Sequence, residues 1–210
     1  MYLSLLKLNP RSRRAMTEAS RPYELHRSLM SAFPDKTAGG AGQVLFRLDI
    51  DKESGGMSIL VQSEKEPDWA GLNGAIGFVT EFQSKPFNPS FIQEQALRFR
   101  LRANPTKRVK ETGKRQGILG EEAQLDWLRK RGRQSGFEVV DANVTEEGFA
   151  RDKSKEASGL RHNMTLLSVR FDGVLRVIDA EAFQRTIEQG IGSAKGLGFG
   201  LLSVAPVSRG

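Results

Sequence analysis

The chain has 210 residues and a formal net charge of +7, with 38% apolar and 27% charged residues, a composition typical of one large or two small globular domains. It contains no cysteine, which excludes disulfides, cysteine-ligated zinc, iron–sulfur clusters and a cysteine nucleophile and favours the cytoplasm. Because there is no run of about 18 apolar residues and the apolar start ends at Lys7, we expect neither a membrane span nor a signal peptide.

The first half of the chain predicts the order strand, helix, strand, strand, helix, strand. Asn9-Pro10 ends the first strand, because proline removes a ladder donor and restricts the residue before it. Pro22 marks the first turn of a helix that runs to about Phe33. A proline-punctuated stretch, 85–89, is predicted to be the linker. The expected strands are Tyr2–Leu8, Val44–Ile50, Met57–Gln62 and Val79–Phe82, with a short helical turn at Asp68–Leu72.

The second half repeats this order. A helix is expected at Glu121–Ser135, and Asp179 is a candidate cap for a helix that runs through Gln189. Asp172-Gly173 predicts a hairpin turn between two strands. The expected strands are Ala96–Ala103, Phe137–Val140, Met164–Phe171, Val174–Ile178 and Leu201–Ala205.

A strand followed by Asn-Pro and a basic stretch occurs at Asn9-Pro10 and again 95 residues later at Asn104-Pro105. Each half approximates the βαββαβ order of ferredoxin-like folds, which RNA-recognition modules also use. We therefore predict an α+β protein made of two tandem ferredoxin-like (RRM-like) domains. The first, residues 1–90, would carry a candidate catalytic helix, and the second, residues 91–210, a basic strand and loop and a glycine-rich loop.

The positive charge is concentrated in residues 98–133, which hold 12 Lys or Arg and 4 Asp or Glu, a net charge of +8. Such a block favours a polyanionic partner, although a solvated helix face has the same composition. Strict alternation in the strand 97–102 places three arginines on one face. Like charges at this spacing repel one another, and a phosphate backbone would relieve the repulsion. The candidate RNA-binding residues of the block are Arg98, Arg100, Arg102, Lys107, Arg108, Lys114 and Arg115.

A second basic loop, 151–155, is either a hairpin tip that enters an RNA groove or a solvated surface loop. On the first interpretation Lys153 and Lys155 would contact RNA.

The helix that begins at Pro22 is the most informative segment. Its core stripe at helical spacing consists of Pro22, Leu25, Leu29 and Phe33. His26 lies at the edge of this stripe, Tyr23 lies one turn earlier on the same flank, and Arg27 lies towards solvent. An imidazole at a core border can keep one nitrogen accessible, and its pKa near neutrality suits proton transfer. A packed, hydrogen-bonded structural histidine has the same spacing, and both interpretations remain open.

Metal binding is not predicted. The only other histidine is His162, far away in the sequence, and no paired carboxylate motif accompanies either one. Asp49, Asp51 and Glu53 have calcium-loop spacing, but the glycines that follow fall at the wrong offset, which favours a turn. We therefore expect no metal and no small-molecule cofactor.

The stretch 190–202 is dense in glycine. In nucleotide-binding folds the glycines follow a strand and open a helix, whereas here they follow a predicted helix and precede a strand, which argues against a nucleotide-binding enzyme. Free amides in such a loop can hold phosphate, with Lys195 adding charge. A tight helix-to-strand turn explains only some of the glycines. The candidate residues for phosphate binding are Gly192, Lys195, Gly196 and Gly198.

Five motifs occur in order: the opening strand with Leu8-Asn9-Pro10, then 22–27 (PYELHR), 66–69 (EPDW), 99–108 (FRLRANPTKR) and 196–203 (GLGFGLLS). Together they resemble the CasE family, the CRISPR-associated endoribonuclease of type I-E systems, over nearly the whole chain. Between Glu138 and His162 no family motif is found.

The resemblance implies a tandem ferredoxin-like protein that cuts the repeat stem-loop of precursor CRISPR RNA without metal. It also implies that the protein stays bound to the mature crRNA in the Cascade complex, among other subunits. The family's catalytic histidine falls on His26, its helper tyrosine on Tyr23, and its glycine-rich loop on Gly190–Gly200. The other hypothesis is a non-catalytic RNA-binding subunit in which His26 is structural.

Overall fold

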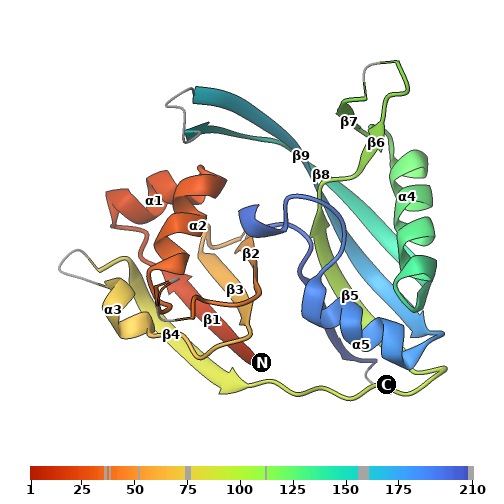
Figure 1. The fold of residues 1–210 in the computed structure, drawn as a ribbon, viewed down its shortest axis with the longest axis horizontal. Helices are drawn as coiled ribbons and strands as arrows, with labels where there is room; N and C mark the ends of the chain where they lie inside the picture. Colours follow the sequence, from red (N-terminus) through yellow and green to blue (C-terminus); the bar gives the residue numbers. More distant parts are fainter. Residues whose placement is uncertain are drawn as a thin grey trace. The chain divides into compact units, whose positions relative to one another are not determined.

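The structure is a computed structural model that describes residues 1–35, 37, 39–51, 53–73, 77–111, 113–155 and 161–207; the side chains of 73, 152–155 and 161–164 lie outside this description. The chain forms two compact units, each built around one sheet (Figure 1). Unit 1 comprises Met1–Asn88, Ala150–Thr165 and Gly196–Gly198. Unit 2 comprises Pro89–Phe149, Leu166–Lys195 and Phe199–Gly210.

Unit 1 contains a four-stranded antiparallel sheet with the strand order β2-β3-β1-β4. Leu6, in the middle of the sheet, pairs with Ile59 on one side and with Phe82 on the other. This order is that of a ferredoxin-like fold, in which the two outer strands follow the two helical segments. The strands are β1 (Tyr2–Leu8), β2 (Val44–Ile50), β3 (Met57–Ser63) and β4 (Val79–Pro86).

Three helices pack on one face of this sheet: α1 (Arg13–Ala19), α2 (Pro22–Met30) and α3 (Trp69–Asn73). Leu25 and Leu29 of α2 are buried in the same core as Leu6 and Phe46. The sequence did not indicate α1, which begins because the Ser12 hydroxyl accepts a hydrogen bond from the Ala15 amide.

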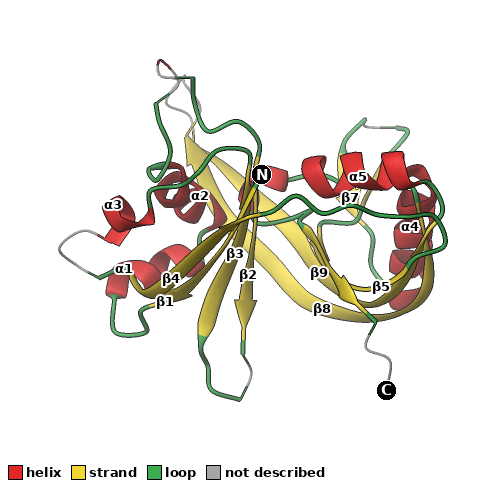
Figure 2. Cartoon of the chain, turned by 90° about the horizontal axis from the view of Figure 1, so that it is seen from below, coloured by secondary structure: helices red, strands yellow, loops and turns green. Residues whose placement is uncertain are grey.

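Unit 2 repeats the arrangement with the strand order β10-β5-β9-β8 (Figure 2). Its strands are β5 (Ala96–Ala103), β8 (Phe137–Lys155), β9 (Arg161–Val177) and β10 (Leu202–Pro206), with a small hairpin of β6 (Thr106–Arg108) and β7 (Arg115–Gly117). The helices are α4 (Glu121–Gln134) and α5 (Ala180–Gln189), and a 3-10 turn, η3, covers Lys195–Leu197. Trp127 of α4 stacks on Phe171, and Phe183 of α5 packs edge-on against Phe137. The predicted pair of ferredoxin-like folds is confirmed.

The predicted hairpin turn at Asp172-Gly173 is wrong. β9 runs without interruption through both residues, and Gly173 pairs with Phe99 of β5. A Cβ atom at Gly173 would overlap with the Asp141 carbonyl oxygen and lie 2.8 Å from the Ala142 Cα. Glycine is therefore needed here for the close approach of the neighbouring backbone and not for a turn.

Other boundaries also differ from the prediction, among them those of β8, β4 and α2. β8 has 19 residues and not four, because its distal part is polar and is held by ladder pairing that apolar periodicity does not report. β4 continues through Pro86 into the predicted linker. α2 ends at Met30, where the Ser31 hydroxyl donates a hydrogen bond to the Ser28 carbonyl at 2.7 Å. None of the helices in the described ranges is long and apolar enough to cross a membrane.

Candidate active site and nucleic-acid interface

His26 lies at the edge of the α2 core face, as its position beside Leu25 predicted, and is half-buried. Its ring stacks on Phe46 of β2, with the ring centroids 6.4 Å apart and the planes inclined by 19°. Nδ1 is enclosed and has no hydrogen-bond partner among the described residues. Nε2 is therefore the nitrogen that is left to exchange a proton with a ligand.

Burial lowers the pKa of His26 below the ordinary histidine value, because the charged form loses hydration in the protein. The imidazole is therefore neutral near pH 7. A neutral imidazole with one accessible nitrogen can take a proton from a hydroxyl group or, once protonated, return it to a leaving group.

The segment Gly196–Gly198 belongs to unit 1 and covers the His26–Phe46 pair. A Cβ atom on Gly196 would lie 3.7 Å from His26 Cε1. Gly198 has a φ of +83°, and a Cβ atom there would lie 3.0 Å from the Phe46 ring. The two glycines thus let the backbone pack directly on the histidine and on the phenylalanine that supports it.

Tyr23 and Arg27 lie on the same helix as His26. Tyr23 is half-buried one turn before the histidine, and its helper role remains a prediction. The Arg27 side chain is 71% exposed and forms an ion pair with Glu24 at 2.5 Å. Its charge is partly compensated within α2, which weakens it as a phosphate ligand, although an exposed pair of this kind contributes little stability and can open.

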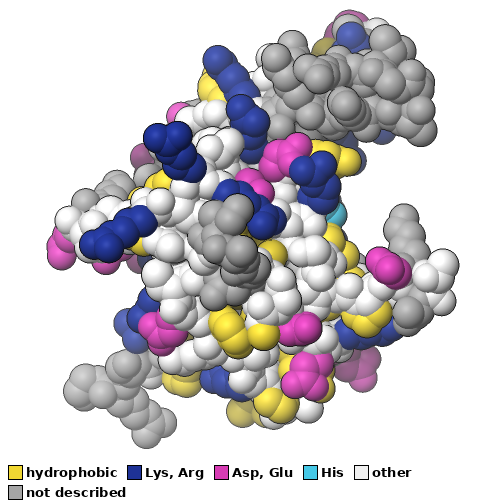
Figure 3. Space-filling model, turned by 90° about the vertical axis from the view of Figure 1, so that its left-hand side faces the viewer, with side chains coloured by type: hydrophobic (Ala, Val, Ile, Leu, Met, Phe, Trp, Pro, Cys, Tyr) yellow, Lys and Arg dark blue, Asp and Glu magenta, His cyan; other side chains and the backbone are white. Residues whose placement is uncertain are grey.

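Further arginines on α1 and in the turns beside it are exposed. Figure 3 views the molecule from the side on which α1 and α3 lie in Figure 1 and shows several Lys and Arg side chains spread over this face, with Asp and Glu side chains among them. Of the arginines on α1, Arg14 has a structural role, because it donates to Glu18 at 2.9 Å and to Ser28 at 2.8 Å and lies over the Phe78 ring. The other exposed arginines on α1 and in the turns beside it are Arg11, Arg13 and Arg21.

The arginine row of β5 alternates with core residues as predicted, but carboxylates relieve its repulsion. Arg100 pairs with Asp172 of β9, and Arg102 donates to Glu147 at 2.7 Å and to Ser168 at 2.8 Å. The inference that these arginines need a phosphate backbone is therefore wrong. The β5–β9 register places Asp172 opposite Arg100, and Glu147 reaches Arg102 from β8; the sequence alone did not show either pairing. Contact between RNA and the row, including the exposed Arg98, remains a prediction.

These pairs change the result expected for alanine substitution. The sequence predicted that replacing all three arginines would reduce the salt dependence of RNA binding by up to about three phosphate contacts. We now expect Arg100→Ala with Arg102→Ala to leave the slope of log K against log salt nearly unchanged. The melting temperature should fall, because Asp172 and Glu147 each lose one arginine partner and keep Arg170. A slope smaller by two contacts, measured by titration at four salt concentrations, would contradict this expectation.

The basic loop after β5 forms the β6–β7 hairpin, in which Arg108 pairs with Arg115 and Lys107 with Gln116. Lys107, Arg108, Lys114 and Arg115 are all exposed. Lys107 and Arg108 line a pocket together with side chains of α4. Sequence reasoning did not single out those α4 residues, although their charges lie within the basic block. The aromatic and cationic residues among them are Trp127, Lys130 and Arg131.

The glycine run follows α5 and precedes β10, as predicted, an order opposite to that of nucleotide-binding folds. Gly192, with a φ of +83°, lies against Trp127, where a Cβ atom would be 3.3 Å from the indole. At Gly200, with a φ of +84°, a Cβ atom would lie 2.5 Å from the Ile191 carbonyl oxygen. Close packing thus explains much of the glycine density, and phosphate binding by these amides remains a prediction. Burial lowers the pKa of Lys195, which lines a second pocket with Gly192.

Lys153 and Lys155, the candidates of the second basic loop, belong to β8, but their side chains lie outside the described residues, as does that of His162.

The chain is similar to proteins of one family. The family model described as CRISPR associated protein matches residues 1–206. The CRISPR-associated endoribonuclease Cse3 of Thermus thermophilus is 37% identical, covering 98% of this chain and 100% of the relative. The Cascade subunit CasE of Escherichia coli is 32% identical, covering 88% of this chain and 92% of the relative.

Solved structures agree with these relatives. Cse3 bound to a 19-nucleotide RNA matches with a TM-score of 0.87 and 36% identity, covering 98% of this chain and 100% of that one. Cas6e from E. coli matches with a TM-score of 0.70 and 28% identity, covering 99% and 100%. Because the family model and both relatives match nearly the whole chain, we conclude that the chain belongs to the CasE family of CRISPR-associated endoribonucleases of type I-E systems.

Proposed function

We propose that this protein is a metal-independent endoribonuclease that cleaves the repeat stem-loop of precursor CRISPR RNA. The observation that carries the proposal is His26: a neutral, half-buried imidazole with one enclosed nitrogen, at the position where the family's catalytic histidine falls. The 37% identical relative is named an endoribonuclease, and a solved Cse3 structure is a pre-cleavage complex with RNA.

The proposed reaction is attack of a ribose 2′-OH on the adjacent phosphate, which forms the O2′–P bond and breaks the P–O5′ bond. The products are a 2′,3′-cyclic phosphate and a 5′-OH. His26 takes the proton from the 2′-OH or donates one to the leaving oxygen, a role typically worth roughly 10²–10⁴-fold in rate. Tyr23 orients the reacting groups, and nearby basic side chains stabilise charge developing on the phosphorus oxygens.

The proposed partners are the repeat stem-loop, the mature crRNA that remains bound, and the other subunits of Cascade, all in the cytoplasm. The relative from E. coli is named a Cascade subunit, and related chains occur in solved Cascade structures. Turnover can then be slow, because a subunit that retains its product needs to act only once.

Cleavage of a labelled repeat hairpin tests this function directly. We expect cutting to continue at an unchanged rate in excess EDTA, because the proposed proton transfers use an imidazole and no metal. A 2′-deoxy substitution at the scissile nucleotide should block cutting completely, since it removes the only nucleophile proposed. Loss of activity in EDTA that Mg²⁺ or Mn²⁺ restores would contradict the first expectation. A cut deoxy substrate would identify water as the nucleophile.

The pH dependence reports which way His26 moves the proton. Burial lowers the pKa of His26, so the neutral form persists to a lower pH than for an ordinary histidine. If His26 is the base, the rate should rise with pH and reach its plateau below the pH expected for an unperturbed imidazole. If it is the acid, the rate should fall as pH rises through the same region. If the single-turnover cleavage rate neither rises nor falls with pH in this region, His26 does not transfer a proton in the rate-limiting step.

A further inference from the structure

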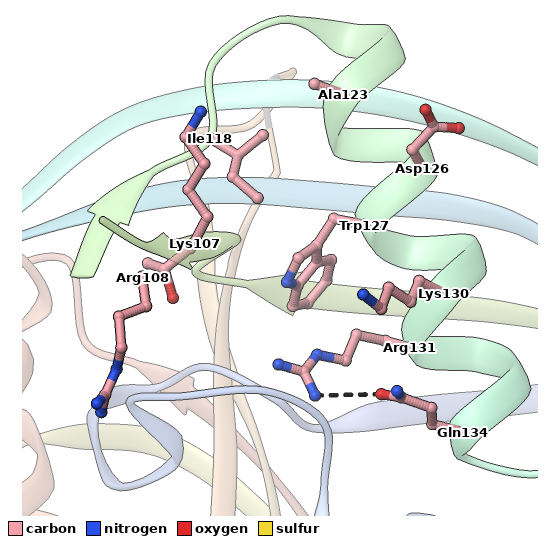
Figure 4. Close-up of a pocket in the computed structure, with 10 residues that line it drawn as sticks. Lys107, Arg108, Ile118, Ala123, Asp126, Trp127, Lys130, Arg131 and Gln134 are labelled. Carbon is pink, nitrogen blue, oxygen red and sulfur yellow. Dashed lines mark hydrogen bonds between the residues drawn. The ribbon is translucent and has the colours of Figure 1, made fainter. Parts of the chain in front are cut away.

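A groove on unit 2 lies outside the active site. It runs between α4, the β6 strand and the loop 190–195, and consists of two adjoining pockets of about 560 and 370 Å³. Trp127, Arg131, Thr106 and Gln134 line both pockets. Figure 4 shows the indole between cationic side chains of α4 and of β6. We call this surface the Trp127 groove.

The groove carries strong positive charge. Its cationic lining is Lys107, Arg108 and Lys130 on one side, Arg115 and Lys195 on the other, and Arg131 on both. Among the described residues, Asp126 is the only carboxylate that lines it, and Asp126 pairs with Arg129 at 3.4 Å. Within the described ranges, no ion pair neutralises Lys107, Arg108, Arg115 or Lys130. The groove is therefore suited to an anion with more than one charge.

The middle of the groove is aromatic and rigid. The indole of Trp127 stacks on Phe171, with ring centroids 6.1 Å apart and planes inclined by 19°. Gly192 lies against its far edge, where a Cβ atom would be 3.3 Å from the indole. Ile118 and Ala123 extend the apolar lining. An apolar floor between two groups of cations is complementary to a nucleotide base with a phosphate on each side.

A single strand satisfies this pattern and a duplex does not. In a duplex the base faces are stacked inside the helix, so that only phosphates would reach the groove, and its apolar floor would stay empty. Unstacked bases use aromatic side chains as platforms while basic residues follow the backbone. We propose that the Trp127 groove binds a single-stranded segment continuous with the repeat hairpin, with one base against Trp127 and its flanking phosphates at the two cationic ends. The inference rests on the proposed function, since it concerns the same RNA.

The test compares three RNAs that all carry a 2′-deoxy scissile nucleotide. One is the blunt hairpin, the second has single-stranded extensions, and the third has extensions of abasic nucleotides. For the wild-type protein we expect extensions to strengthen binding about tenfold, from stacking and phosphate contacts together. Abasic extensions keep the phosphates but have no bases. They should therefore strengthen binding less, and the increase in affinity that they give should depend on salt concentration.

Two variants divide the gain. Trp127→Leu should lose the part that depends on the bases, and Arg108→Gln with Lys130→Gln the part that depends on the phosphates. Because Trp127 contributes to the core, its variant is first checked by thermal unfolding. If that variant is unfolded, the Arg108→Gln/Lys130→Gln variant and the abasic RNA test whether the groove binds the single strand. Arg185→Gln, which removes a 60% exposed charge from α5, is the matched control and should keep the full gain.

Three results would overturn the inference: extensions that do not strengthen wild-type binding, an equal gain in Arg108→Gln/Lys130→Gln, or an acidic peptide that competes as well as the extended strand. The last result would assign the groove to a protein partner. Cleavage of the ordinary hairpin by the wild type is measured separately. Its absence would refute the proposed function while leaving the affinity comparison intact.

Discussion

His26→Ala should slow cleavage of a cognate repeat hairpin by roughly a hundredfold to ten-thousandfold, the range that a lost general acid or base produces. Hairpin affinity should change little, because the imidazole is neutral near pH 7 and its removal costs the RNA no charge contact. The side chain borders the α2 core and is only half-buried, so the truncation should leave a small cavity between Phe46 and Gly196. Single-turnover cleavage and equilibrium binding to a 2′-deoxy hairpin measure the two effects.

Tyr23→Phe is the milder companion variant, since the ring keeps its packing and only the hydroxyl group is lost. Leu29→Ala controls for general damage to the helix: it lies one turn after His26 and is fully buried, so it should lower stability without selectively removing cleavage. If a folded His26→Ala protein cuts at the wild-type rate, the active-site assignment fails. The non-catalytic RNA-binding subunit then becomes the better interpretation.

Gly173→Ala should destabilise unit 2 by about 1–3 kcal/mol or prevent it from folding, as overpacking of a tight site does. Gly173 lies in the middle of β9, and a new Cβ atom would overlap with the Asp141 carbonyl oxygen and crowd the Ala142 Cα at 2.8 Å. Both are backbone atoms of the neighbouring strand, which cannot move aside by changing a rotamer. Urea unfolding followed by circular dichroism measures the loss.

Gly71→Ala is the control for this substitution. A Cβ atom there would lie 3.4 Å from an Asp68 carboxylate oxygen, an ordinary contact, and Gly71 is in the α3 helix, where alanine lowers the entropy lost on folding. Its stability should stay the same or rise. A Gly173→Ala protein as stable as this control would mean that β8 and β9 separate readily at this position. The continuous strand would then not require glycine.

The sequence by itself determined the elements that depend on local chemistry. β1, β2 and β5 begin and end at the predicted residues, because alternation and the Asn-Pro pair or charged turn after each strand act within a few residues. The Asp179 side chain accepts a hydrogen bond from the Ala182 amide and caps α5 as expected. The edge position of His26 on α2 also followed from helical spacing alone.

Only the tertiary structure decided what depends on contacts between distant segments. Asp172-Gly173 has turn chemistry, yet the backbone of β8 needs the space, and the strand continues. The alternation of arginines in β5 predicted a row that binds phosphate. In the structure, however, the register with β9 brings Asp172 to Arg100. In both cases a partner more than 30 residues away changes the meaning of a local pattern.

The candidate site shows the same division. Helical spacing placed His26, but its enclosed Nδ1 depends on the fold that brings Phe46 of β2 and the glycine segment 196–198 against its ring. Likewise, Trp127 and Lys130 have helical spacing typical of any amphipathic helix. Only the packing of α4 beside β6 and the loop 190–195 makes them part of the lining of a charged groove. Burial and proximity are properties of the folded chain, and they set the pKa of a histidine and the charge of a pocket.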